Sequence, residues 1–292
     1  MIVHMTAGEY LAYCYPVLEK QPLLRPGDES FTAFWKEAEG GNVLRFLEEN
    51  VSPAIQRFPF ENTDALRIFF AETLGGRLPV IVTGSHADFC SMEAALNGRR
   101  KVADYPFTVN AFTIEAWAVK IRRHRVILLG SAPYSNISAD LLGLEERDWL
   151  ERSFRLRLAH ECTHYETLRL FGDMRNHALD EIAADAFGQL AAFGNFSAAR
   201  QRLFFGLEPG GNSCTGRLAF YCDSVVPEER PAVYRAVDAV LADVEREVTA
   251  LLSRKKQKYD ILRQLICLSI AERLRRQDSA QPPLTGVSLG KI

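Results

Sequence analysis

The sequence predicts an α+β protein in which a small mixed sheet is followed by a mainly helical C-terminal lobe. Short β-prone runs bounded by Gly or Pro cluster between residues 78 and 130, and long amphipathic segments without such breaks begin near residue 145. With 292 residues, 47% of them apolar and 25% charged, the chain has the composition of an ordinary globular protein. We therefore expect one large domain or two lobes around a substantial core.

Residues 1–75 are predicted to form a helical N-terminal segment. Thr6 can cap a short helix, because Glu9 stands three residues later in the capping-box position. Residues 30–50 have an amphipathic pattern that is broken by a Gly pair. A further helix is expected over residues 62–75, ending at two consecutive glycines.

Residues 76–172 are predicted to hold the sheet and the helix on which it packs. Three runs have the apolar, β-prone composition of strands, and Gly follows two of them directly. They are residues 78–83, 107–117 and 125–129. A short helix is expected over 92–96, and a loop rich in Pro, Ser and Asn over 131–143.

Residues 173–276 are predicted to form the helical C-terminal lobe. Its helices follow a long helix at 145–171, which ends at a Gly. They are expected over 178–193, over 197–205, and over 227–276 with a break near 253–258. The tail 277–292 contains two consecutive prolines and is expected to be disordered.

The chemistry of the chain centres on His160-Glu161-Cys162-Thr163-His164, an HExxH motif within the long helix. Two histidines four positions apart on a helix point the same way, so both imidazoles can bind one zinc ion at about 2.0–2.1 Å. Glu161 leans over the metal from the side and is placed to act as general base toward a zinc-activated water. The motif therefore predicts a Zn²⁺ site.

A catalytic zinc site needs a third protein ligand, and the next helix offers one. Glu181 follows His164 by 17 positions, so a tight connection and a returning antiparallel helix would bring it back to the metal. Asp185 lies on the same helix face, four residues later. It is expected to accept a hydrogen bond from the outer nitrogen of a ligand histidine.

This arrangement resembles the gluzincin metallopeptidases, the clan of thermolysin and the M1 aminopeptidases. The resemblance covers about residues 155–190, with a slightly shorter spacing between the second histidine and the glutamate, and indicates a divergent branch. It implies a zincin-like fold with an edge strand packed on the HExxH helix. It also implies that His160, His164 and Glu181 are the zinc ligands. Glu161 would be the general base, and Asp185 would hydrogen-bond to a ligand histidine. Asp180 stands where the family often has asparagine.

In gluzincins a tyrosine or histidine downstream of the glutamate ligand stabilises the oxyanion. Tyr221 is our first candidate for this catalytic role, and Tyr234 and His177 are the others. His177 also shares the face of Glu181 and is a candidate substrate contact or alternative ligand, although a histidine at a helix start is more often exposed. Asn110 lies in a candidate edge strand, 108–113, whose Asn-Ala-Phe sequence resembles that of thermolysin, and is expected to contact substrate.

Other residues have simpler interpretations. Arg157, three positions before His160, could pair with a carboxylate that supports a metal ligand, but we favour a surface arginine. Cys162 points away from the histidines and is expected to pack in the core without acting as a nucleophile. His86 and His124 have no partners at matching spacing and are expected to be structural or surface residues.

The expected function is that of a cytoplasmic zinc-dependent peptidase or amidase acting on a peptide or amide substrate. A formal net charge of −2 gives no reason to expect a nucleic-acid partner, and no apolar run is long enough to span a membrane. The N-terminus lacks the pattern of a secretory signal, so the six cysteines are expected to be reduced. The sequence leaves the oligomeric state open.

Two alternatives remain open at this stage. One is a non-proteolytic zinc-binding module whose metal is capped by a fourth protein ligand such as Asp185 or Cys214. The other is a tailoring enzyme specific for one peptide or amide. An aminopeptidase would also need carboxylates to hold a free amine, and nothing singles out Glu93 or Glu115 for that role.

Overall fold

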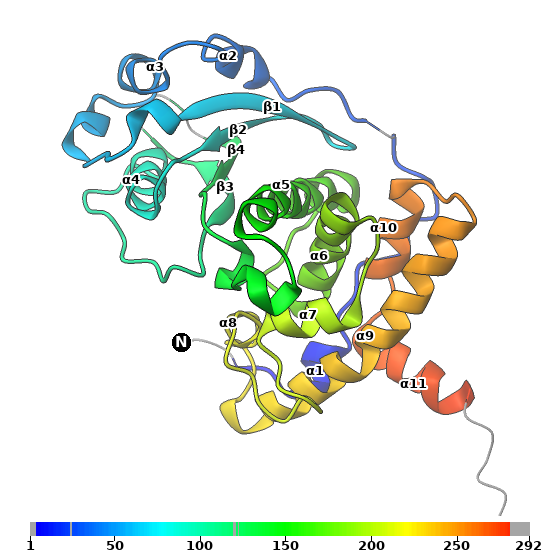
Figure 1. Ribbon diagram of the computed structural model, residues 1–292. Helices are drawn as coiled ribbons and strands as arrows, with labels where there is room; N and C mark the ends of the chain where they lie inside the picture. Colours follow the sequence, from blue (N-terminus) through cyan, green and yellow to red (C-terminus); the bar gives the residue numbers. More distant parts are fainter. Residues whose placement is uncertain (1–3, 24, 119–120, 122, 281–292) are drawn as a thin grey trace, which may run out of the picture.

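The computed structural model describes residues 4–23, 25–118, 121 and 123–280. A four-stranded sheet and the helices on its outer face form one part of the molecule, and a bundle of helices forms the other (Figure 1). The long helix α5 (Glu146–Phe171) lies between these two parts and packs against both. The mixed α+β class expected from the sequence is confirmed.

The sheet has the strand order β1-β2-β4-β3. Its strands are β1 (Arg67–Thr73), β2 (Gly76–Val82), β3 (Ala111–Ala116) and β4 (His124–Leu129). The β1–β2 and β3–β4 pairs are antiparallel and the β2–β4 pair is parallel, so the sheet is mixed. β3 is an edge strand, and no other described strand pairs with its outer side. The three strands predicted from the sequence all form, and β1 adds a fourth.

The outer face of the sheet is covered by short helices. They are α2 (Thr32–Lys36), α3 (Val43–Asn50), α4 (His86–Leu96) and the 3₁₀ turns η1 (Pro53–Arg57) and η2 (Thr63–Ala65). Buried apolar side chains such as Trp35, Leu47 and Phe89 pack with the strands into one hydrophobic core, which α5 joins from the other face through Cys162 and Tyr165. His124 packs against the ring of Phe31 in the same region.

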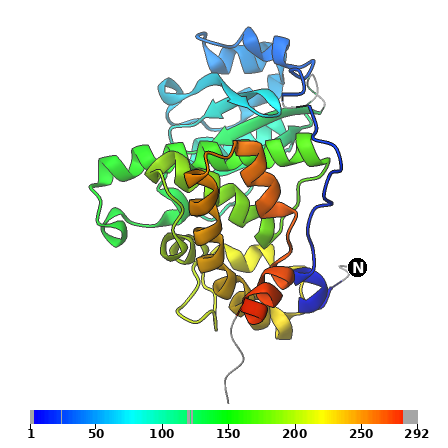
Figure 2. The same ribbon diagram turned by 90° about the vertical axis from the view of Figure 1, so that its right-hand side faces the viewer.

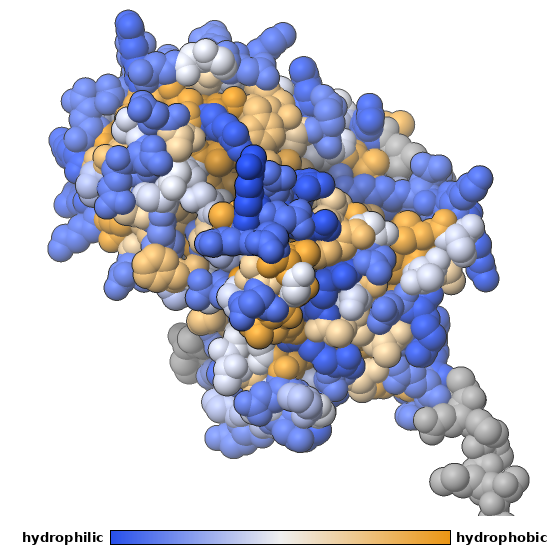
Figure 3. All heavy atoms as spheres, in the orientation of Figure 1, coloured by the Kyte–Doolittle hydropathy of each residue, from blue (hydrophilic) through white to orange (hydrophobic). Residues whose placement is uncertain are grey.

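The helical part is built around a second core. Its helices are α1 (Ala7–Leu11), α6 (Ala178–Phe193), α7 (Ala198–Phe205), α8 (Leu218–Tyr221), α9 (Arg230–Ser253), α10 (Lys258–Ile266) and α11 (Ile270–Ala280). Three 3₁₀ turns complete it: η3 (Tyr134–Asn136), η4 (Ala139–Leu142) and η5 (Pro227–Glu229). Hydrophilic residues cover most of the face in Figure 3, with hydrophobic areas between them. No described helix is long and apolar enough to cross a membrane.

The α5–α6 pair agrees closely with the prediction. α5 ends at Gly172, which adopts the left-handed conformation, and five connecting residues lead into α6. α6 then packs along α5 over an extensive contact. This helical hairpin brings residues 17 positions apart in the sequence onto facing helix surfaces.

The predicted helix over residues 62–75 is wrong. Residues 63–65 form one 3₁₀ turn and Arg67–Thr73 form β1, which pairs with β2 from Arg67↔Val82 to Thr73↔Gly76. Gly75 belongs to the hairpin turn and is not a helix cap. A Cβ at Gly75 would lie 2.9 Å from the side chain of Arg169, so the turn can approach α5 only with glycine at this position.

The C-terminal prediction also needs correction. The segment after residue 227 forms three helices, since α11 follows α9 and α10. Residues 277–280, expected to be disordered, belong to α11, and the rest of the tail, 281–292, lies outside the described residues.

The N-terminal segment ties the helical part together. Figures 1 and 2 show α1 beside α9 and α11, and Thr6 and Glu9 form the predicted capping box. The Tyr10 hydroxyl accepts a hydrogen bond from the backbone N–H of Ala178 at the start of α6 (2.8 Å). The Tyr10 ring also stacks on His177, with 3.9 Å between the ring centroids.

His177 is a buried helix cap. Its Nδ1 accepts the N–H of Leu179 at 3.0 Å, and its Nε2–H donates to the carbonyl of Tyr10 at 3.0 Å. The bond to Nδ1 requires the neutral ring, because a protonated imidazole carries hydrogens on both nitrogens and cannot accept. Burial lowers the pKa of His177 from its ordinary 6.5 to about 4.

His177 should therefore make folding stability pH-dependent. Its folded pKa lies below its unfolded value, so its contribution is complete above pH 6.5 and falls as the pH drops toward 4. We expect the metal-free protein to lose roughly 3 kcal/mol more stability between pH 7 and pH 4 than His177→Asn, whose amide can still cap α6. Urea unfolding of both proteins at the two pH values measures this difference. Equal losses would contradict the assignment.

Candidate metal centre

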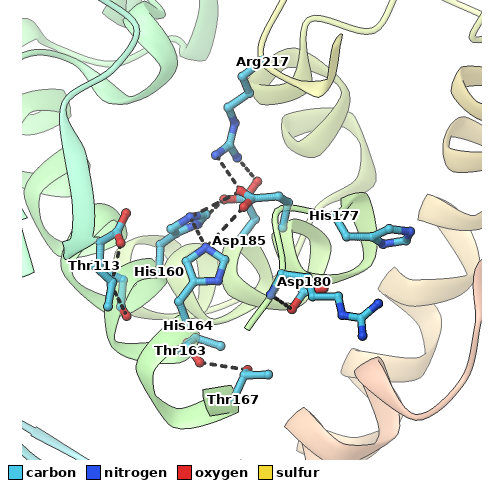
Figure 4. A network of polar contacts seen from close by, with 12 residues as sticks. Thr113, His160, Thr163, His164, Thr167, His177, Asp180, Asp185 and Arg217 are labelled. Atoms are coloured by element: carbon cyan, nitrogen blue, oxygen red, sulfur yellow. Dashed lines mark hydrogen bonds and ion pairs between the residues drawn. The ribbon is translucent and has the colours of Figure 1, made fainter. Parts of the chain in front are cut away.

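Three side-chain atoms from the α5–α6 hairpin converge on one point. The Nε2 atoms of His160 and His164 are 3.0 Å apart. The carboxylate of Glu181 lies 3.4 Å from the first and 3.3 Å from the second. All three side chains are buried, and they form a group of ligating atoms that could hold a metal ion. Figure 4 shows both imidazoles pointing toward the carboxylates on α6.

The size of this triangle suits zinc. A tetrahedral ion with bonds of about 2.0–2.1 Å keeps its ligand atoms about 3.3 Å apart. The three measured separations, 3.0, 3.3 and 3.4 Å, match one face of such a tetrahedron. Two imidazoles and one carboxylate are also a ligand set found in catalytic zinc sites. The donor set therefore fits Zn²⁺.

The electrostatics of the triangle favour a cation. Burial by itself would lower the pKa of His164, but the carboxylates of Glu181, Glu161 and Asp180 outweigh that effect and raise the pKa to about 9. Burial likewise opposes ionisation of Glu181, yet His164 and His160 lower its pKa overall. The carboxylates around the triangle thus stabilise a positive charge at this position, which either a proton or a metal ion can supply.

Asp185 lies behind His160 and orients it. Its Oδ1 accepts Nδ1–H of His160 at 2.8 Å, which leaves the Nε2 lone pair directed at the triangle. The hydroxyl of Tyr134 donates to the same oxygen at 2.5 Å. The other oxygen accepts Nε2–H of Gln201 at 2.5 Å and a hydrogen bond from Arg217. Despite its complete burial, Asp185 has a pKa well below the usual range, because Arg217 and His160 outweigh desolvation.

Glu161 is held by the edge strand. Thr113 of β3 donates its hydroxyl to the Glu161 carboxylate at 2.7 Å, and the same Oγ1 lies 3.1 Å from the Glu161 carbonyl oxygen. Glu161 lines the same pocket as the three converging residues. The carboxylate of Glu161 is thus held beside the three converging residues but is not one of them.

The centre opens into a cavity of about 450 Å³. One wall is the stretch 108–113, which leads into and includes the first residues of β3, and the opposite wall consists of 174–176 with Arg217, Phe220 and Tyr221. Asn110 lies in this lining as predicted; it is buried, and its Oδ1 has no hydrogen-bond partner among the described residues.

Of the three oxyanion candidates, the structure brings only Tyr221 to the cavity. Burial, followed by the charge of Glu181, raises the pKa of Tyr221 well above the ordinary value, so its hydroxyl remains a donor. Tyr234 packs in the helical core outside this lining. His177, also predicted as a substrate contact, lies outside the lining as the buried cap of α6 and is not exposed. In Figure 4 its ring is turned away from the centre.

Two further predictions can be compared with their positions. Cys162 is buried, and burial raises the pKa of its thiol to about 12, in agreement with a packing role. Cys214 directs its thiol to the carbonyl of Phe205 and is outside the metal-ligand group found among the described residues. Asp185 meets the outer nitrogen of His160, so neither residue caps the centre.

The prediction of a surface position for Arg157 is wrong. Its side chain is 2% exposed and donates to the carbonyls of Gly130 (2.9 Å) and Ala132. Its helical phase, one turn before His160, contained this signal, because residues three apart share a helix face. Thr113, Tyr134, Gln201 and Arg217 were missed as contributors, since strand, turn and loop positions carry no comparable pattern.

Tyr134 should contribute to metal affinity through Asp185 and His160. We expect Tyr134→Phe to weaken zinc binding by about 10–100-fold, the range typical for partners that orient metal ligands. Zinc competition with a chromophoric chelator measures the change. Tyr105→Phe removes a phenol hydroxyl that lies beside Glu93, outside the cavity lining, and serves as the control. Unchanged zinc affinity in Tyr134→Phe would show that Tyr134 does not support the metal centre.

Comparison with known proteins gives one match. The family of unknown function DUF7005 matches residues 117–275, a stretch that includes α5, α6, Tyr134 and Arg217 but not Asn110 or Thr113. Neither the comparison with curated proteins nor that with solved structures finds a match. Since the match spans more than half of the chain, this protein belongs to the family of unknown function DUF7005.

Proposed function

We propose that this protein is a zinc-dependent hydrolase of peptide or other amide bonds, with a zincin-like arrangement of sheet and active-site helix. The observation that carries the proposal is the convergence of His160, His164 and Glu181 beside Glu161 at the floor of an open cavity. No fourth ligand closes the triangle among the described residues. A metal site with three protein ligands and an open position is the arrangement used for catalysis.

Zinc bound at this centre would act as a Lewis acid, polarising an amide carbonyl and lowering the pKa of water toward about 7. Glu161 accepts a proton as the oxygen of water attacks the carbonyl carbon. It then delivers that proton to the amine as the C–N bond breaks, so that an acid and an amine leave the site. Thr113 keeps the carboxylate of Glu161 in one orientation throughout.

The cavity walls supply the remaining roles. The hydroxyl of Tyr221 donates a hydrogen bond to the developing oxyanion. Asn110 forms part of the wall along which the amide would lie, with its Oδ1 buried against Gly130. The outer side of β3 offers unpaired backbone groups to an extended substrate. These assignments agree with the lining of the cavity, to which all three elements contribute.

Glu181 should be required for metal binding. Glu181→Gln is expected to lower zinc affinity by more than about 100-fold, because it removes a ligand and not only a supporting contact. Metal analysis after dialysis against a weak chelator measures the zinc retained. Glu151→Gln, a neutralised glutamate on the exposed side of α5, is the matched control. Stoichiometric zinc in Glu181→Gln would place the third ligand elsewhere.

Glu161 should be required for turnover but not for metal binding. Glu161→Gln is expected to keep its zinc and to lose about 10²–10⁴-fold in rate, since the amide cannot accept a proton. A library of fluorescence-quenched peptides, read with and without a zinc chelator, measures hydrolysis, and Glu151→Gln again serves as control. Wild-type rates in zinc-loaded Glu161→Gln would refute the proposed role of the general base.

A further inference from the structure

Arg157 is a buried cation that forms no ion pair with any described carboxylate, although the charge of Glu161 acts on it from a greater distance. Only 2% of its surface is exposed, and no carboxylate of the described residues lies within ion-pair distance of its guanidinium. The two described arginines with comparably buried side chains, Arg217 and Arg273, each have a carboxylate partner. A buried charge normally has a counter-ion, because desolvation without one is costly.

The two contacts that Arg157 does make do not account for its charge. Its guanidinium donates to the carbonyls of Gly130 and Ala132, the residues that join β4 to the turn carrying Tyr134. Carbonyl oxygens also accept from neutral N–H donors, so these contacts do not by themselves require a charged side chain. A guanidinium has five N–H groups, so donors remain after these two contacts. Burial lowers the pKa of Arg157 to about 10, while Tyr134 and the carboxylate of Glu161 oppose that shift, so the guanidinium stays charged at neutral pH.

Arg157 also lies where a substrate would bind. It lines the cavity together with His160, Glu161 and Tyr134. It is three residues before His160 on α5, hence one helical turn away on the same side. The other arginines of the lining are already paired, Arg217 with Asp185 and Glu181, and Arg175 with Asp173.

The acidic residues of the cavity have other tasks. Glu161 and Glu181 are the only carboxylates among its described lining residues. Glu181 is one of the converging ligands, and Glu161 is held by Thr113. Glu93 and Glu115 pair with arginines outside this lining. With a divalent cation at the centre, the positive charges of the site would outweigh the negative ones, and no carboxylate is free to hold an amine.

We infer that Arg157 binds a carboxylate of the substrate. This inference rests on the proposed function and narrows its substrate class to peptides or amides that carry an anionic group within reach of the metal. The carboxylate can be an acidic side chain or a free C-terminus, since a guanidinium binds both in the same way. A free amino terminus, by contrast, finds no acidic partner on these walls.

Three zinc-binding hydroxamates test this inference without requiring turnover. Each carries the same succinyl hydroxamate group, linked to glutamine amide, to glutamate α-amide, or to glutamine with a free carboxylate. The first is neutral, and the other two are isomers that place the carboxylate on the side chain or at the C-terminus. Calorimetry on the zinc-loaded protein should give at least one isomer about tenfold tighter binding than the neutral compound, and the preferred isomer identifies the source of the carboxylate.

Variants assign this preference to a residue. Arg157→Gln should bind the neutral hydroxamate as tightly as the wild type does. Its affinities for the carboxylate and neutral compounds should differ by no more than about twofold. Arg157→Lys should retain part of the preference for the carboxylate. Arg152→Gln, which removes a positive charge from the same helix outside the cavity lining, should leave the preference unchanged. Binding of the neutral compound reports an intact centre in each variant.

Three results would overturn the inference. The first is the absence of a carboxylate preference in the wild type. The second is a full preference in Arg157→Gln. The third is its loss in Arg175→Gln, which would assign the anion to the opposite wall. Failure of all three hydroxamates to bind the wild type would instead contradict the metal centre itself, so the two failures are distinguishable.

Discussion

The convergence of three lone pairs in a buried pocket is the constraint on which this structure depends. His160, His164 and Glu181 present ligating atoms 3.0–3.4 Å apart, an arrangement that could hold a metal ion between them. The carboxylates that raise the pKa of His164 favour positive charge at this position. The α5–α6 hairpin creates the convergence, and it lies at the junction of the two hydrophobic cores. The packing of the whole molecule therefore determines the dimensions of the centre.

Asp185 extends this constraint into the helical part. Its two oxygens accept hydrogen bonds from His160, Tyr134, Gln201 and Arg217, which come from α5, η3, α7 and the residue before α8. A buried carboxylate satisfied from four directions is stabilised in its charged form and has little freedom to move. It fixes the ring of His160, and its hydrogen bonds connect elements that are far apart in the sequence. The N-terminal segment adds to this, because the Tyr10 hydroxyl bonds both the start of α6 and the carbonyl of Tyr221.

The features predicted correctly from the sequence depend on local periodicity. The spacing of His160 and His164 on one helix, and of Glu181 and Asp185 on the next, follows from helix geometry alone, and a short connection makes the two helices meet. Thr113, Tyr134 and Arg217 reach the site from a strand, a turn and a loop, where local sequence does not determine position. β1 was mistaken for a helix because the glycines of its hairpin turn also resemble a helix end.

Arg157 shows a different limit of sequence reasoning. An arginine on an amphipathic helix is normally exposed, which is why a surface position is expected for Arg157. Its position one helical turn before His160 favours the buried side instead. Its burial becomes visible only when the loop after β4 folds over α5 and offers two carbonyls. The convergence of His160, His164 and Glu181 could thus be predicted from the sequence, whereas the residues that surround them, and the charge of the cavity, required the fold.

X-ray absorption spectroscopy of the zinc-loaded protein tests the central claim most directly. The account predicts one zinc ion per chain with only nitrogen and oxygen neighbours at about 2.0–2.1 Å and the outer-shell scattering of two imidazoles. This signature should disappear in His160→Ala and His164→Ala. A sulfur neighbour at about 2.3 Å, or a spectrum that survives the loss of either histidine, would contradict a His-His-Glu centre.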